Sequence, residues 1–433
     1  MFVYVLGKDG QPLMPTKRCG KVRRMLNRKQ AKVVSRCPFT IQLLYETTTI
    51  VTQPVEVGDD TGSKHNGLSA VAVYKDGREV EVYSSEVQMR TDITKLLSAR
   101  REFRRARRNR TTRYRKPRFN NRVHSKHKGW LAPSVENKIL THEREVLFIC
   151  SVLPVIKVTI EIASFDLQKL KADMEGLKRP QGEEYQHGEQ YGFWNVREYV
   201  LFRDGYTCQC CKGKRGDKRL NVHHIESRQT GGNAPNNLIT LCETCHNGYH
   251  EGKIKLPDSA KRKQPLRDAT FMGIMRWAFY DRIKETLTAM GIKVDKTYGY
   301  LTKNTRILNS LPKTHCADAR CISGHPNAEP LDYYFYKKKV RCHNRQLHKA
   351  TFLKGGVRKA NQAQKEVRGF RLFDKVMFNG KECFIFGRRT SGYFVLRTLD
   401  GTKVHAAASY KKLRLLKRAD TILTERRVQE IAV

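Results

Sequence analysis

Four cysteines form two C-x-x-C pairs, Cys208/Cys211 and Cys242/Cys245. Four thiolates with this spacing form a closed tetrahedral site for a structural Zn²⁺. The other cysteines are scattered along the chain, which is typical of a metal-binding protein in a reducing compartment rather than a secreted disulfide framework. The alternative is four ordinary buried cysteines. We therefore expect one structural Zn²⁺ and a cytoplasmic location.

Histidines lie between and after the cysteine pairs. His223 and His224 stand next to each other on a predicted strand, while His246 and His250 follow the second pair. Because His246 and His250 are four residues apart, they share one face of a helix. Neutral imidazoles bind divalent metals, and an imidazole can also accept a proton from water. Phosphodiester hydrolysis needs both abilities.

Three acidic residues occupy separate parts of the chain. Asp60 follows a predicted strand in a G-x-D-x-G sequence, Glu161 lies within an apolar strand, and Asp318 lies near a predicted helix start, three residues after His315. Taken singly, each has an ordinary explanation: a turn former, a solvent-facing side chain and a helix-dipole partner. As a set they are candidates for a divalent-metal site, since hard cations bind carboxylates.

The chain is strongly basic, with 84 Lys and Arg against 42 Asp and Glu and a net charge of +42. Such a charge attracts polyanions, because each neutralised phosphate releases counterions. No apolar run is long enough to span a bilayer, so no membrane partner is expected. An arginine-rich run after Asp92 predicts a basic helix. Its candidate nucleic-acid ligands are Arg100, Arg101, Arg104, Arg105, Arg107, Arg108, Arg113 and Arg115.

Changes in composition divide the chain into segments that must position these residues. Strand patterns, helical spacing and polar stretches alternate, so we expect a multidomain protein of mixed α+β and α/β class. The predicted segments are a basic module (1–52), a β-rich part (53–90), the arginine-rich helix (91–128), a helix and strand (129–166), a polar linker (167–195), the Cys/His segment (196–255), a linker and helix (256–290), a third part (291–330) and a basic β-rich region (331–433).

The Cys/His segment resembles the HNH, or ββα-metal, nuclease motif. That resemblance implies that His223 binds the catalytic metal and that His224 is the general base. It further implies that Asn237 orients the loop and that His246, joined by His250, completes the metal site. A zinc-binding module without catalysis is the alternative.

The acidic residues, taken together, resemble the RuvC-type, RNase H-like nucleases, whose motifs read G-x-D-x-G, I-E and H-x-x-D-A. The resemblance implies that Asp60, Glu161 and Asp318 hold Mg²⁺ (or Mn²⁺) and that His315 helps to activate water. Asp59 departs from the pattern, because an apolar residue usually stands there. It could bind metal weakly or only alter strand packing.

The HNH-like segment lies between Glu161 and Asp318, and the chain also has a P-L-M-P sequence at Pro12–Pro15. In this order the features resemble the IscB family, transposon-encoded relatives of the type II CRISPR effector nucleases. The resemblance implies a split RuvC core (53–90, 129–166 and 291–330) with an inserted HNH domain, an arginine-rich bridge helix and a C-terminal small β-barrel that reads a target-adjacent motif.

Membership of that family implies a monomer in a ribonucleoprotein, with a structured guide RNA and a double-stranded DNA target as partners. Base pairing would read the sequence and the protein would read the flanking motif. The HNH site would cut the guide-paired strand and the RuvC site the displaced strand. The alternatives are an unguided HNH homing or nicking endonuclease and a non-enzymatic RNA-binding module with a zinc staple.

Overall fold

The structure is a computed structural model that describes residues 1–47, 50–108, 130–162, 192–193, 195–227, 232–233, 235–257, 267–341 and 364–429, with side chains omitted at 107–108 and 267–271. The chain divides into two compact units: unit 1 is Met1–Ala163 with Met272–Val433, and unit 2 is Ser164–Phe271. Arg113, Arg115 and nearly all of the predicted linker at 167–195 lie outside the described residues. Among the described helices, none has the length and apolar character needed to cross a membrane.

The N-terminal module is a four-stranded sheet in the order β2-β1-β4-β3, with one helix on it. Val3, Val22 and Ile41 are buried between the helix and the sheet. The P-L-M-P sequence forms edge strand β2, which the sequence pattern did not predict; an edge position tolerates prolines because it requires fewer ladder hydrogen bonds. The elements are β1 (Val3–Leu6), β2 (Pro12–Thr16), α1 (Cys19–Asn27), β3 (Ala31–Arg36) and β4 (Phe39–Leu43).

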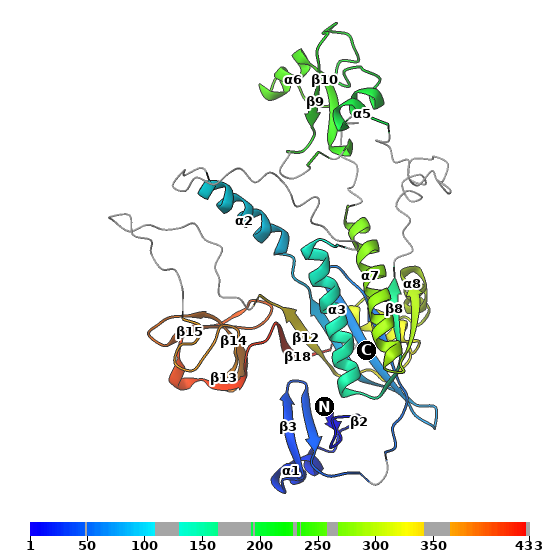
Figure 1. The fold of residues 1–433 in the computed structure, drawn as a ribbon, viewed down its shortest axis with the longest axis vertical. Coiled ribbons are helices and arrows are strands. Elements are labelled where there is room, and N and C mark those ends of the chain that lie inside the picture. Colours follow the sequence, from blue (N-terminus) through cyan, green and yellow to red (C-terminus); the bar gives the residue numbers. More distant parts are fainter. Residues whose placement is uncertain are drawn as a thin grey trace. The chain divides into compact units, whose positions relative to one another are not determined.

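A seven-stranded sheet forms the centre of unit 1, in the order β11-β8-β5-β6-β7-β12-β18. Strands β5, β6 and β7 form an antiparallel meander, and β8 and β11 run parallel to β5. Figure 1 shows β12 and β18 as adjoining strands. The strands are β5 (Val55–Asp60), β6 (His65–Val73), β7 (Glu79–Gln88), β8 (Val155–Ile162), β11 (Lys293–Tyr298), β12 (Tyr333–Lys339) and β18 (Ile422–Val428).

Helix α9 lies unusually close to this sheet because two strand positions lack side chains. A Cβ added to Gly58 would lie 1.9 Å from the Ala319 carbonyl oxygen, and one added to Gly67 would lie 2.1 Å from the His315 carbonyl oxygen. Thr314 caps the helix, since its hydroxyl accepts a hydrogen bond from the Ala317 amide. These glycines therefore bring the start of α9 against β6 and its second half against β5.

Prolines and glycines mark the ends of two other helices. Ser134 does not cap α3; the helix begins at Pro133, whose fixed φ suits the first helical position. Met290 is exposed, because α7 ends before it and Gly291 follows with φ +76°. The helices of unit 1 beyond α1 are α2 (Ile93–Arg108), α3 (Pro133–Val152), α7 (Arg267–Ala289), α8 (Gly299–Leu308) and α9 (His315–Ser323).

A second sheet of five antiparallel strands, in the order β16-β15-β14-β13-β17, forms most of the described C-terminal region. Val376, Ile385 and Phe394 are fully buried in its core. Closure into a barrel stays a prediction, as do the domain limits; β12 and β18, from the range assigned to the C-terminal region, pair within the seven-stranded sheet. The elements are β13 (Lys375–Phe378), β14 (Lys381–Arg388), β15 (Tyr393–Arg397), β16 (Lys403–Ser409), η4 (Tyr410–Lys412) and β17 (Arg414–Lys417).

Unit 2 is built around a two-stranded antiparallel sheet. In its register His223 pairs with Ile239 and His224 with Leu238. Thus the histidine pair lies at the end of the hairpin next to the loop that joins its strands. The elements are α5 (Val196–Arg203), β9 (Leu220–His224), η2 (Pro235–Asn237), β10 (Leu238–Cys242) and α6 (Glu243–His250).

Candidate functional site

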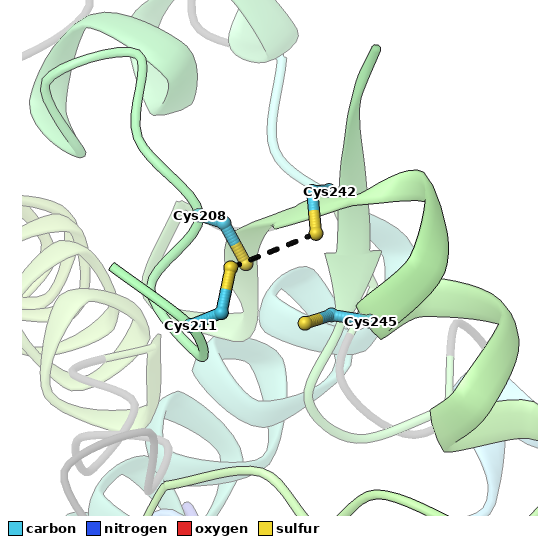
Figure 2. Close-up of side chains that lie close together, drawn as sticks. All are labelled: Cys208, Cys211, Cys242 and Cys245. Atoms are coloured by element: carbon cyan, nitrogen blue, oxygen red, sulfur yellow. Dashed lines mark hydrogen bonds between the residues drawn. The ribbon is translucent and has the colours of Figure 1, made fainter. Parts of the chain in front are cut away.

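The four paired cysteines of unit 2 converge, as Figure 2 shows. Cys208 and Cys211 follow α5, Cys242 ends β10 and Cys245 lies in the first turn of α6; their sulfur atoms all lie within 4.8 Å of one another. Burial raises the pKa of the Cys242 thiol to about 12. A bound Zn²⁺ would stabilise the thiolate forms of these four side chains, so the donor set fits a tetrahedral Zn²⁺. Cys210 is not part of it, since its Sγ lies 3.9 Å from the Lys255 carbonyl oxygen.

Three histidines form a second cluster in unit 2. His223 on β9 and His246 and His250 on α6 each place one ring nitrogen within 4.8 Å of the others. His223 is 6% exposed, and its Nε2 has no hydrogen-bond partner among the described atoms. Burial, together with the neighbouring histidines, lowers the pKa of His223 to about 4. Its imidazole is therefore neutral near pH 7 and presents a lone pair, which fits a divalent metal.

His224 lines the same site. It lines a pocket of about 380 Å³ together with His223, His246 and His250, and its Nε2 lies 3.0 Å from Oδ1 of Asn233. Unlike His223, His224 is solvent-accessible. The pocket thus places a fourth imidazole beside the three that could bind a metal.

Asn237 holds the loop that follows His224. Its Oδ1 accepts a hydrogen bond from the Glu226 amide at 2.9 Å, and its Nδ2 donates to the carbonyl oxygens of Glu226 at 3.1 Å and Gly232 at 3.0 Å. The side chain is fully buried. These bonds tie Glu226 and Gly232 to one amide, and the orienting role that the HNH resemblance implies for Asn237 stays a prediction.

The acidic residues of unit 1 come together at the ends of β5 and β8 and the start of α9. Burial raises the pKa of Glu161, and the nearby carboxylates of Asp60 and Asp318 raise it further. Burial likewise raises the pKa of Asp318, with Asp60 as the next cause. Carboxylates that oppose one another's ionisation are relieved by a bound divalent cation, so this group fits Mg²⁺ or Mn²⁺.

His315 is in direct contact with this acidic group. Its Nδ1 lies 2.6 Å from Oδ2 of Asp60, and this hydrogen bond raises the pKa of His315. The bond fixes the ring from one side only, which leaves Nε2 available. The structure thus brings Asp60, Glu161, His315 and Asp318 together from three separated segments.

Two arginines that the sequence analysis missed balance the acids. Arg276 of α7 lies 3.0 Å from Glu161 and also donates to the Thr61 carbonyl oxygen at 2.7 Å, and Arg306 of α8 lies 3.0 Å from Asp318. In the described structure their guanidinium groups supply positive charge next to the carboxylates. No motif marks either arginine; only their places on helices that follow the HNH-like segment could have suggested them.

Asp59 does not belong to the acidic group that contains Asp60. Successive strand residues face opposite ways, and the Asp59 side chain is fully buried, with its Oδ1 4.0 Å from Nδ1 of the buried His142. Burial raises the pKa of Asp59, and Asp60 adds to the effect, while burial lowers the pKa of His142 to about 3. The structure therefore supports the packing alternative for Asp59 rather than weak metal binding.

Helix α2 carries the arginine-rich run. Arg100, Arg101 and Arg105 are exposed and Arg104 is half-buried. None of the residues whose burial is described on α2 is buried, although Leu97 and Phe103 are apolar. A helix without a buried face gains little from packing and needs another partner to stabilise it. The side chains of Arg107 and Arg108 lie outside the described residues.

Two family models match parts of the chain. A family model described as RRXRR protein matches residues 3–188, and one described as HNH endonuclease matches residues 208–252. Anaredoxin from Nostoc sp. (strain PCC 7120 / SAG 25.82 / UTEX 2576) is 35% identical over 67 residues, which cover 15% of this chain and 86% of that protein.

Two solved structures of lower similarity also match. Streptococcus thermophilus Cas9 in complex with the AGAA PAM gives a TM-score of 0.29 at 11% identity, covering 45% of this chain and 26% of that chain. The Type II-C Cas9 enzyme from Actinomyces naeslundii gives 0.24 at 10% identity, covering 62% and 59%. This chain therefore spans less than two thirds of either solved chain.

Proposed function

The chain belongs to the IscB-like nucleases and carries an HNH endonuclease domain, and we propose that it cuts both strands of a DNA duplex selected by a bound guide RNA. In this proposal unit 2 cuts the guide-paired strand and the acidic group of unit 1 cuts the displaced strand. A target-adjacent motif is read by the basic region at 331–433.

In the HNH site, His224 accepts the proton of the attacking water, because it lines the pocket without belonging to the three histidines that would hold the metal. Asn237 keeps the adjoining loop in place through its three hydrogen bonds. His223, His246 and His250 would hold a divalent cation. When bound, such a cation stabilises charge that develops on the phosphate oxygens.

In unit 1, we infer an RNase H-like core. The order β7-β6-β5-β8-β11, with an antiparallel meander followed by parallel strands, supports this inference. Asp60, Glu161 and Asp318 would hold Mg²⁺ or Mn²⁺, and His315 orients or deprotonates the attacking water through its free nitrogen.

One observation carries the two-site proposal. The acids that converge in unit 1 come from chain segments on both sides of unit 2 in the sequence, and unit 2 contains its own complete histidine set. A single-site homing endonuclease has no need for the acidic group, and an RNA-binding module has no need for either site. Two chemically distinct hydrolytic sites suit a substrate with two strands held in different environments.

Strand-labelled cleavage tests the assignment. His224→Ala should leave an enzyme that nicks only the displaced strand, and Asp60→Ala should leave one that nicks only the guide-paired strand, because each change removes one site's base or metal ligand. The double variant should still bind target DNA, since neither residue contributes a phosphate contact.

Asp76→Ala provides the matched control, because Asp76 is exposed in the turn between β6 and β7. It should cut both strands at the normal rate. If either single variant still makes double-strand breaks, or each loses both cuts, the two-site assignment is wrong. Treatment with ribonuclease before target DNA is added separates the alternatives: a guided enzyme loses cleavage, whereas a homing endonuclease keeps it.

A further inference from the structure

A third set of metal-binding side chains lies in unit 1 next to the acidic group. His65, Glu86 and His315 each place one donor atom within 4.8 Å of the other two. The rings of His65 and His315 lie parallel, at 3° and 5.6 Å between centroids. Neither His65 nor Glu86 belongs to the acidic motifs, so the proposed cleavage mechanism gives them no role.

The sheet register explains why these residues meet. Gly67 pairs with Glu86, and His65 is two residues before Gly67 on the same face of β6. Glu86 on β7 is therefore the diagonal neighbour of His65. Because Gly67 has no side chain, the first turn of α9 lies directly over it and brings His315 beside His65. The three donors are thus fixed by the fold rather than by chance surface rotamers.

Hydrogen bonds orient both rings for metal binding. The Nδ1 atom of His65 lies 2.6 Å from Oε1 of Glu86, and the Nδ1 atom of His315 lies 2.6 Å from Oδ2 of Asp60. An ion bound by all three side chains would therefore replace the hydrogen bond between His65 and Glu86 as the link between their donor atoms, whereas Asp60 would still hold the His315 ring through its other nitrogen. Carboxylates hold histidine ligands in zinc sites in this way, fixing the ring and increasing its basicity.

The donor set differs in kind from that of the acidic group. Two imidazoles and one carboxylate suit Zn²⁺, Co²⁺ or Ni²⁺, whereas Mg²⁺ prefers oxygen ligands. The three side chains are 33%, 21% and 43% exposed, so an ion can reach them from solvent. The same chain can therefore distinguish two classes of divalent metal at neighbouring positions.

We propose that His65, Glu86 and His315 bind a borderline divalent metal such as Zn²⁺ and that binding there inhibits cleavage at the acidic site. The inhibition follows because His315 cannot serve as a metal ligand and act on water at the same time. This part rests on the proposed function, whereas the binding site itself does not. Zn²⁺ at this site would convert a double-strand cutter into an enzyme that cuts through unit 2 alone.

Metal binding can be measured without reference to cleavage. The full-length protein, with its cysteine site loaded with Zn²⁺, is titrated with Co²⁺, and the bound ions are counted by visible absorption and equilibrium dialysis. His65→Gln should weaken Co²⁺ binding at this site by about 100-fold and so remove one bound ion per chain. Glu86→Gln should do the same, and it provides a second variant if the first folds poorly.

The exposed His405 on β16 provides the matched control: His405→Gln should bind as many Co²⁺ ions as the wild type. Equal Co²⁺ binding by the wild type, His65→Gln and Glu86→Gln would overturn the site.

Cleavage then tests the inhibition. With Mg²⁺ in excess, added Zn²⁺ should slow displaced-strand cutting by the wild type and by His405→Gln, but not by His65→Gln. Equal slowing of His65→Gln and the wild type, or no slowing of the wild type, overturns the inhibitory role. Absence of displaced-strand cutting in Mg²⁺ alone contradicts the proposed function, and the Co²⁺ count still decides the binding site.

Discussion

Asn237 offers a direct test of how the HNH loop is held. Asn237→Ala removes three hydrogen bonds, one from the Glu226 amide and two to the carbonyl oxygens of Glu226 and Gly232. At about 1 kcal/mol for each bond, opening of the loop should become easier by about 3 kcal/mol. Since about 1.4 kcal/mol corresponds to a factor of ten, the open population should rise by about 100-fold.

Hydrogen exchange reports this opening at a defined atom. The Glu226 amide donates to Asn237, so its exchange in the full-length protein should become about 100-fold faster in the Ala variant. Asn237→Asp keeps the acceptor for that amide but sets a carboxylate against two carbonyl oxygens, so it should also open the loop. Asn247→Ala is the matched control, because Asn247 is exposed on α6.

Cleavage should follow exchange. A loosened loop lets Asn233, the partner of His224, move away, so the guide-paired strand should be cut more slowly while the displaced strand is cut as before. If the Glu226 amide exchanges at the wild-type rate in Asn237→Ala, the side chain does not hold the loop and the reasoning fails. If exchange quickens but cutting of the guide-paired strand does not slow, the loop does not position His224.

Three other substitutions give clear outcomes. Cys245→Ser should remove the structural Zn²⁺ and unfold unit 2, giving a zinc content near zero by metal analysis and loss of guide-paired-strand cutting, whereas Cys210→Ser should keep the metal. Replacing Arg100, Arg101 and Arg105 by Ala should weaken guide-RNA binding and lower the salt slope by about one per lost phosphate contact; an unchanged slope in filter binding would contradict the assignment. Lys337→Met should lower unfolding stability by about 3–5 kcal/mol in urea titrations, because it leaves the buried Glu145 unpaired, and adding Glu145→Gln should recover part of the loss.

The local parts of the sites could be predicted from the sequence because their geometry follows from spacing. Two C-x-x-C pairs bring four thiols together when a hairpin and a helix join them, and the structure places Cys208 and Cys245 in one cluster. The i, i+4 spacing likewise puts His246 and His250 on one face of α6. These arrangements depend on few residues and on short chain segments.

Long-range pairings could not be predicted in the same way. Strand β18 pairs with β12, although all five strands of the C-terminal sheet lie between them in the sequence. No turn or alternation pattern links the two segments. Arg276 of α7 and Arg306 of α8 reach the acids only in the folded protein, so their role depends on tertiary structure. No motif marks His65, which begins β6 and meets His315 through the close approach of α9.

Asp59 shows how the fold accommodates a charge-bearing residue beside a catalytic acid. Burial raises the pKa of Asp59 and lowers the pKa of His142 to about 3, so burial favours the neutral form of both side chains. The His142 ring is held by a 3.2 Å contact between its Nε2 and the Gly62 carbonyl oxygen. Asp60, in contrast, contacts His315 and is the carboxylate that faces the site. Strand alternation separates the two roles: one aspartate packs inside the protein and the other is available for chemistry.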